Sequence, residues 1–149
     1  MIHTYGEFGV DHVLDMVRAA WGKRKSIYLE CGGSLFVVRA SSQRYRLFME
    51  NRKCVCCGVE GTKFLLQSDK RRWIYYDEQK RITYPIPVWR AHFNLFGERN
   101  GGKVMLTKDH IKPVSLGGRS IMPNYQTLCA LCNRRKGAME IRYGTGEGN

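Results

Sequence analysis

The stretch TKDHIKPVSLGG, residues 107–118, places an acid beside a histidine and follows them with a proline and a pair of glycines. The chain holds only 4 histidines, so the pairing of Asp109 with His110 invites a chemical interpretation. Alone, the dipeptide is weak evidence, because a histidine at the end of a strand is more often a structural hydrogen-bonding residue than a catalyst. The residues that flank the dipeptide therefore determine whether a catalytic or a structural role is the better interpretation.

A β-hairpin is predicted immediately before and through this stretch. The apolar segments AHFNLF (91–96) and KVMLTKDHI (103–111) flank GERNGG (97–102), whose Asn-Gly-Gly core is typical of a hairpin turn. The dipeptide then lies at the end of the second strand. A loop rich in glycine and proline follows at 112–123, and the periodicity of NYQTLCALCNRRKGAMEI predicts a helix from about Asn124 onward.

The first half of the chain predicts further helix and strand elements. Apolar residues at helical spacing predict a helix over 10–21, and Ser41-Ser42 precede a second, basic helix over 43–53. Strands are expected at 26–30 and 34–39, joined by a glycine turn. Strand-like pieces at 62–67 and 72–77, and an extended proline-containing connection at 83–89, complete the reading.

The charge balance points to a polyanionic partner. The 149 residues include 25 Lys and Arg against 13 Asp and Glu, a net charge of +12, and 43% of them are hydrophobic. Such an excess favours nucleic acid, because cationic side chains that bind phosphates release condensed counterions. Neither a secretory signal nor a membrane span is found, so an intracellular, cytoplasmic protein is expected, with a phage-encoded origin among the settings that fit.

The cysteines form two C-x-x-C pairs, Cys54 with Cys57 and Cys129 with Cys132. In a reducing compartment, four such thiolates predict one tetrahedral structural zinc site that pins the ends of the intervening chain. Disulfides, an iron–sulfur cluster and a thioredoxin-like redox pair are the alternatives. Cys56 lies inside the first pair and could replace one of its ligands.

Taken together, these motifs resemble those of the HNH endonuclease family. The resemblance rests on DHIKPVSLGG, on Asn124, and on the ending C-A-L-C-N-R-R-K-G at 129–137, which occur in order. It covers about residues 92–140, together with the first cysteine pair and the helix before it. It implies an α+β fold with a small ββα-metal nuclease core, stapled by the structural zinc and preceded by an N-terminal helix and hairpin extension.

The resemblance also implies a role for each motif residue. His110 is the general base that activates water, and Asp109 and Asn133 hold one divalent metal, Mg²⁺ or Mn²⁺. The side chain of Asn124 bonds to the backbone and keeps the loop that positions His110; the same residue also suits a helix N-cap. The third motif position is often histidine in the family and is Asn133 here.

A basic run follows the last motif residue. Arg134, Arg135 and Lys136 are expected to contact phosphates of the substrate, although cationic residues also suit the last turn of a helix. The domain organisation expected is an N-terminal basic extension over 1–50, a zinc-bound nuclease domain over 51–143, and a disordered tail over 144–149.

These observations predict a metal-dependent DNA endonuclease. One centre per chain fits nicking by a monomer, whereas cleavage of both strands would suggest a homodimer or two successive nicks. Two other classes of protein are compatible with the composition. One is a zinc-stabilised module that binds nucleic acid without cutting it, and the other is an interaction protein that inhibits or recruits a nucleic-acid enzyme.

Overall fold

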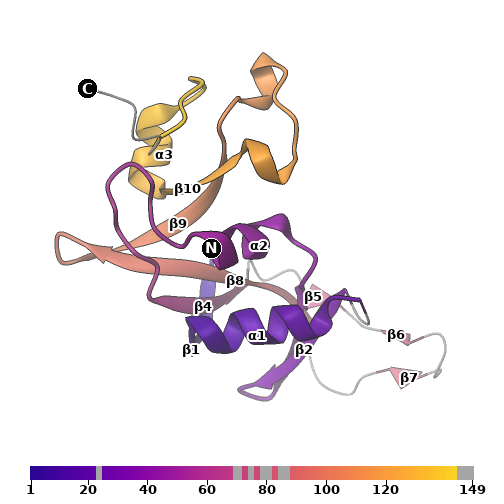
Figure 1. Ribbon diagram of the computed structural model, residues 1–149. Coiled ribbons are helices and arrows are strands. Elements are labelled where there is room, and N and C mark those ends of the chain that lie inside the picture. The colour runs from indigo at the N-terminus through magenta and orange to yellow at the C-terminus, as the bar shows by residue number, and fades with distance from the viewer. Residues whose placement is uncertain (23–24, 69–71, 74–75, 78–81, 84–87, 144–149) are drawn as a thin grey trace. The chain divides into compact units, whose positions relative to one another are not determined.

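The computed structural model describes residues 1–22, 25–68, 72–73, 76–77, 82–83 and 88–143 (Figure 1). The chain forms two compact units from interleaved segments. The first unit comprises 1–41 and 63–94, and the second comprises 42–62 and 95–149. This division differs from the boundaries expected from sequence, and the predicted functional domains over 1–50 and 51–143 stay a prediction. The predicted tail, 144–149, lies outside the described residues.

The described residues of the first unit form one large sheet, one helix, and a separate two-stranded sheet of β6 and β7. The strands of the large sheet are ordered β1-β4-β8-β3-β2, and β5 pairs with β8. β1 with β4 and β2 with β3 are antiparallel, whereas β3 with β8 is parallel. The elements are β1 (His3–Gly9), α1 (Val10–Ala20), β2 (Ser26–Cys31), β3 (Ser34–Arg39), β4 (Lys63–Ser68), β5 (Arg72–Trp73), β6 (Tyr76–Asp77), β7 (Ile82–Thr83) and β8 (Val88–Arg99).

Helix α1 packs on β1, β2 and β4 through its apolar stripe, in which Val13 and Val17 are fully buried. Phe36, Phe64 and Phe93 from three strands are also fully buried in this unit. The predicted helix over 10–21 and the predicted hairpin over 26–39 are confirmed. Strand β1 was not predicted.

The second unit contains the segments that the sequence singled out. Its elements are α2 (Gln43–Glu50), the last part of β8, β9 (Gly102–His110), the short 3-10 turns at Val114–Leu116 and Met122–Asn124, β10 (Tyr125–Cys129) and α3 (Ala130–Lys136). β9 pairs antiparallel with β8 and with β10, and both α2 and α3 contact β9 and β10. The fully buried side chains of Tyr45, Leu95 and Leu128 form part of its core.

The hairpin before the Asp–His dipeptide is confirmed. β8 and β9 meet at Asn100-Gly101, both of which have positive φ, as a tight turn between twisted strands requires. The helix predicted from Asn124 is wrong at its start, because Tyr125–Cys129 form a strand opposite β9 and the helix begins only at Ala130. Pairing with β9 buries all of these residues in a hydrogen-bonded strand pair. This stabilises the strand more than the helical spacing of their apolar side chains would stabilise a helix.

The fold is therefore a mixed α and β protein, and the described part is rich in strands. None of the helices in the described residues is both long and apolar enough to cross a membrane. Strand β9, the loop 111–124, strand β10 and helix α3 follow one another in the second unit, and this succession carries the candidate site.

Candidate active site and metal centre

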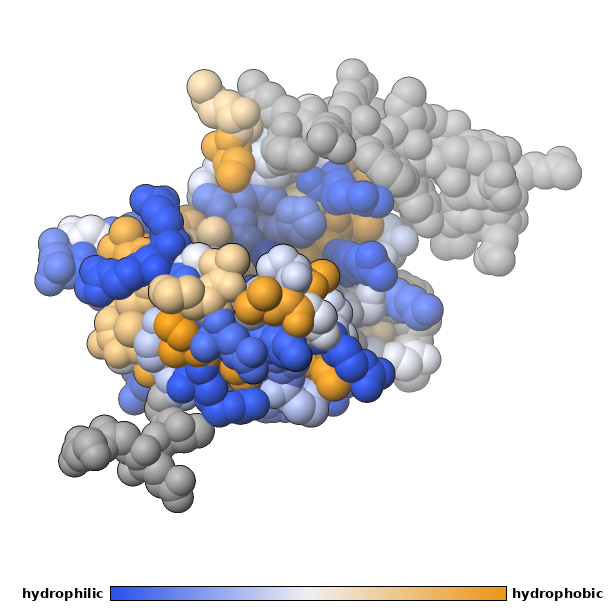
Figure 2. All heavy atoms as spheres, turned by 90° about the horizontal axis from the view of Figure 1, so that it is seen from above, coloured by the Kyte–Doolittle hydropathy of each residue, from blue (hydrophilic) through white to orange (hydrophobic). Residues whose placement is uncertain are grey.

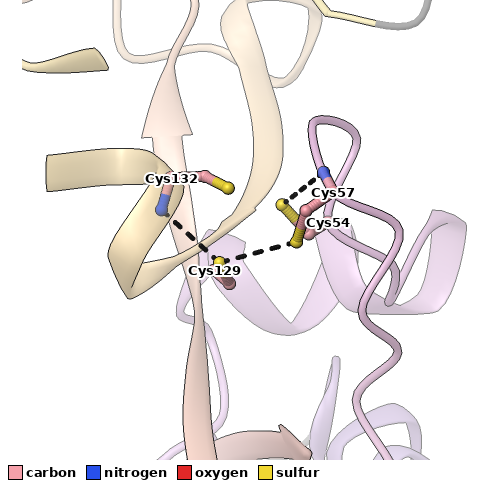
Figure 3. Close-up of side chains that lie close together, drawn as sticks. All are labelled: Cys54, Cys57, Cys129 and Cys132. Carbon is pink, nitrogen blue, oxygen red and sulfur yellow. Dashed lines mark hydrogen bonds between the residues drawn. The ribbon is translucent and has the colours of Figure 1, made fainter. Parts of the chain in front are cut away.

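The four predicted zinc ligands come together in the second unit (Figure 3). The sulfur atoms of Cys54, Cys57, Cys129 and Cys132 all lie within 4.8 Å of one another. The Cys57 and Cys129 sulfurs are 3.8 Å apart. A tetrahedral zinc with bonds of about 2.3 Å requires sulfurs about 3.8 Å apart, so the spacing fits zinc. All six cysteines are free, so no disulfide competes for these thiols.

The two pairs have the same local geometry. The backbone N–H of Cys57 donates to the Cys54 sulfur at 3.5 Å, and that of Cys132 donates to the Cys129 sulfur at 3.5 Å. Each pair is therefore a tight turn that directs two sulfurs to one point. The turn of the first pair is also held against β10, because the N–H of Val55 donates to the carbonyl of Thr127 at 3.0 Å.

The surroundings shift the pKa values of these thiols in opposite directions. Burial raises the pKa of Cys57 and of Cys132, whereas at Cys54 backbone N–H donors outweigh burial and lower the pKa to about 7. Arg99 adds a positive charge, since its Nη1 lies 3.7 Å from the sulfurs of both Cys129 and Cys132. Four thiolates around one Zn²⁺ carry a net charge of −2, which this guanidinium partly offsets.

Asp109 lies at the end of β9 and faces helix α3. Its side chain is buried, and its Oδ2 accepts from Gln126 Nε2 at 3.0 Å and pairs with Lys136 Nζ at 3.2 Å. Lys136 Nζ also donates to the carbonyl of His110 at 2.9 Å. With 1% of its surface exposed, Lys136 directs its charge into the protein. The prediction that it contacts phosphate is therefore replaced by a buried ion pair.

Asn133 reaches the same seam between β9 and α3. Its Nδ2 donates to Thr107 Oγ1 at 2.9 Å, two residues before Asp109 on β9. Asn133 and Lys136 are three residues apart on α3, so they share one helix face. Residues at i and i+2 of a strand also share a face. The structure thus places both predicted ligands of the catalytic metal along one strand–helix seam.

His110 points to the opposite face of the hairpin. Its ring meets that of Tyr125 edge-on, with 4.9 Å between centroids, and its Nε2 lies 3.0 Å from Ser120 Oγ. Tyr125 is itself fixed, because its hydroxyl donates to Gln43 Oε1 at 2.6 Å. Through Gln43, helix α2 therefore holds the Tyr125 ring, which in turn contacts the His110 ring. The sequence analysis did not identify Gln43.

Asn124 holds the loop that follows His110. Its Nδ2 donates to the carbonyls of Lys112 at 3.0 Å and Arg119 at 2.8 Å, and its Oδ1 accepts from the N–H of Lys112 at 2.9 Å. The loop thus closes on one side chain, and the role of Asn124 in positioning His110 for catalysis stays a prediction. Asn124 precedes a strand and is not a helix N-cap. Gly118 permits this closure, since a Cβ there would overlap the Lys112 carbonyl.

The sequence analysis did not identify four positioning residues, Gln43, Arg99, Ser120 and Gln126. It also missed the buried role of Lys136. Of these, only the role of Lys136 had a signal in the sequence, because its spacing of three residues from Asn133 puts the two side chains on one face of a helix. Gln126 was hidden by the helix predicted over its segment; read as a strand, it lies directly opposite Asp109.

The comparison with protein families agrees with the resemblance. Residues 98–140 match a family model described as HNH endonuclease, and this segment includes Asp109, His110, Asn124 and Asn133. The first cysteine pair lies outside the match. Comparisons with curated proteins and with solved structures give no significant match. The match associates the strand–loop–strand–helix segment with nucleases.

Replacing a cluster cysteine is expected to abolish metal binding. Cys132→Ser removes one of four convergent sulfurs, so purified protein should lose stoichiometric zinc and become less stable. Elemental analysis measures the metal, and it also separates zinc from iron. Cys31→Ser, which lies outside the cluster, is the matched control, and Cys56→Ser tests the alternative ligand. Retention of one tightly held zinc by Cys132→Ser would contradict this ligand set.

Breaking the buried ion pair is expected to destabilise the protein. Lys136→Met leaves the Asp109 carboxylate buried without its counter-charge, which should lower the free energy of unfolding by about 3–5 kcal/mol. Urea denaturation of zinc-loaded protein measures this loss. Arg135→Met, an exposed neighbour on α3, should change stability by no more than about 0.5 kcal/mol.

The double variant Lys136→Met with Asp109→Asn completes the test. Because it removes both charges together, it should be more stable than Lys136→Met alone. Equal stability of Lys136→Met and Arg135→Met would show that the pair contributes nothing.

Proposed function

We propose that this chain is a metal-dependent HNH endonuclease that hydrolyses phosphodiester bonds of DNA. The observation that carries the proposal is the end of β9, where Asp109 and His110 meet a loop closed by Asn124 and a helix that presents Asn133. The succession of β9, loop, β10 and α3 supports the further proposal that this part of the chain is a ββα-metal core.

His110 is the general base in this proposal. Two contacts fix its imidazole, one from the Ser120 hydroxyl and one from the edge of the Tyr125 ring. A fixed ring can accept a proton from a water molecule without first reorganising, which is what general base catalysis requires. Because the Asn124 side chain binds the carbonyl of Arg119, it also holds Ser120 in place.

The oxygens of Asp109 and Asn133 fit a hard divalent cation such as Mg²⁺ or Mn²⁺. A carboxylate has about four lone-pair positions, and the donors from Gln126 and Lys136 do not use all of them. Such an ion, when bound, would stabilise negative charge on the phosphate and the leaving 3′ oxygen. Lys136 and Gln126 hold the carboxylate in one orientation.

The alternation of side chains along β9 suits an in-line reaction. His110 and Asp109 are consecutive, so they project to opposite faces of the hairpin, and their contacts follow that rule. A phosphate that lies across the end of β9 would have the base on one side and the ligand oxygens on the other. In-line displacement needs the nucleophile and the leaving group on opposite sides of phosphorus.

The basic surface supports a nucleic-acid substrate. Arg134 and Arg135 are exposed on the last turn of α3, next to Asn133, and we propose that they contact phosphates. The net charge of +12 is consistent with such binding. Each chain has a single candidate centre in its described residues, so we propose that a monomer nicks one strand.

Cleavage of supercoiled plasmid by zinc-loaded protein tests the proposal. Nicking is expected with Mg²⁺ or Mn²⁺ and not with EDTA, and His110→Ala should lower its rate by about 10²–10⁴-fold. His12→Ala, an exposed histidine on α1, is the matched control and should cleave normally. No nicking by folded wild-type protein on supercoiled, linear and single-stranded DNA would favour a binding module or an interaction protein.

Loss of the Asn133 oxygen is expected to weaken the binding of the catalytic metal and to leave the general base intact. Asn133→Ala, made in protein that also carries His110→Ala, should bind Mn²⁺ at least about tenfold more weakly. Electron paramagnetic resonance of free Mn²⁺ measures this without cleavage. Asn133→Asp keeps an oxygen ligand and should retain binding. Equal Mn²⁺ affinity in Asn133→Ala and its parent would remove Asn133 from the ligand set.

A further inference from the structure

The loop between β9 and β10, residues 111–124, follows the candidate base in the chain and exposes three apolar side chains. Val114, Leu116 and Ile121 are 61%, 52% and 38% exposed. They are three of the nine large hydrophobic residues that are exposed in the described part of the chain. Connecting segments usually carry polar residues at such positions, so apolar side chains gathered in one loop point to a binding surface.

The loop is held in one conformation. The Asn124 side chain ties both of its arms, and the N–H groups of Leu116 and Gly118 donate to the Pro113 carbonyl at 2.9 Å each. Ser120 connects the loop to His110. A loop restrained in this way presents its apolar side chains at a set position relative to the base, and little conformational entropy is lost when it binds.

The charge of the loop identifies its partner. Lys112 and Arg119 are exposed on it, and its sequence, IKPVSLGGRSIMPN, contains no acidic residue. Figure 2 shows one side of the molecule, on which hydrophobic and hydrophilic residues are intermixed. Cations with aliphatic side chains between them match a DNA groove, whose phosphates flank sugars and base edges.

We infer that the loop 111–124 is the element that sets the register of DNA at the centre, with Val114, Leu116 and Ile121 against sugars and base edges of the minor groove. Lys112 and Arg119 hold the flanking phosphates. Through Ser120 and Asn124, the same loop fixes His110, so contact with the groove places a phosphate beside the base. This inference rests on the proposed function and adds the surface that recognises the substrate.

Binding of a fluorescent 30-base-pair duplex, followed by anisotropy in protein that carries His110→Ala, tests the inference without cleavage. The double change Val114→Ser with Leu116→Ser should weaken binding by about tenfold or more. Leu131→Ser is the matched control, because Leu131 is 45% exposed on α3 outside the loop. Zinc content and circular dichroism establish that each variant is folded.

The dependence on salt separates apolar from ionic contacts. The double serine variant should lose affinity equally at low and high salt, because aliphatic contacts release no counterions. Arg119→Gln should instead reduce the slope of log Kd against log salt by about one. Affinity of the double serine variant within twofold of Leu131→Ser at every salt concentration would overturn the inference.

The outcomes for the loop and for catalysis are distinguishable. If wild-type protein nicks plasmid and the double serine variant binds like its control, the loop inference fails and the nuclease proposal stands. If the variant binds weakly while wild-type protein never cuts, the loop inference holds and the nuclease proposal fails, because the protein then binds DNA without cleaving it. Absence of duplex binding by the parent overturns the inference, and the plasmid assay still reports on catalysis.

Discussion

The convergence of four thiols is the constraint on which the second unit depends. Cys57 lies 72 residues before Cys129 in the sequence, yet the sulfurs of these two residues are 3.8 Å apart. Helix α3 begins at Ala130, directly after one of these ligands, so the cluster determines where the helix starts. Its next turn then carries Asn133 and Lys136 to β9. A short helix of this kind would be marginal alone, and the cluster anchors it at the end where it most needs support.

Positive charge close to Asp109 creates a second constraint. The ammonium of Lys136 neutralises a carboxylate that would otherwise be costly to bury, and it also binds the carbonyl of His110. A divalent cation on the same carboxylate would meet this charge at short range. The arrangement therefore favours an ion that keeps its own waters and takes phosphate oxygens as further ligands, since negative substrate charge offsets the repulsion. If the proposed function holds, the metal and DNA would therefore bind this centre more tightly together than either would alone.

Sequence reasoning predicted the parts of the site that depend on local pattern. The turn at Asn100-Gly101 gives a hairpin because both residues accept positive φ, and the hairpin places Asp109 and His110 at a strand end. The cysteine pairs predicted a common site because their spacing forms tight turns. The error over Tyr125–Cys129 has a physical origin, because a buried ladder against β9 overrode a helical spacing. Contacts such as Gln43 with Tyr125 could not be predicted, since they join residues 82 positions apart.

The division of labour at the end of β9 follows from the geometry of a strand. Neighbouring residues face opposite sides, so an acid and a histidine in sequence cannot form a simple pair, and each needs its own support. Asp109 obtains it from α3 and Gln126, and His110 obtains it from Ser120 and Tyr125. The backbone of His110 is nevertheless bound by Lys136, so the two supports meet at one peptide. A displacement of α3 would therefore move the proposed base as well as the carboxylate, which links the cysteine cluster to both halves of the proposed chemistry.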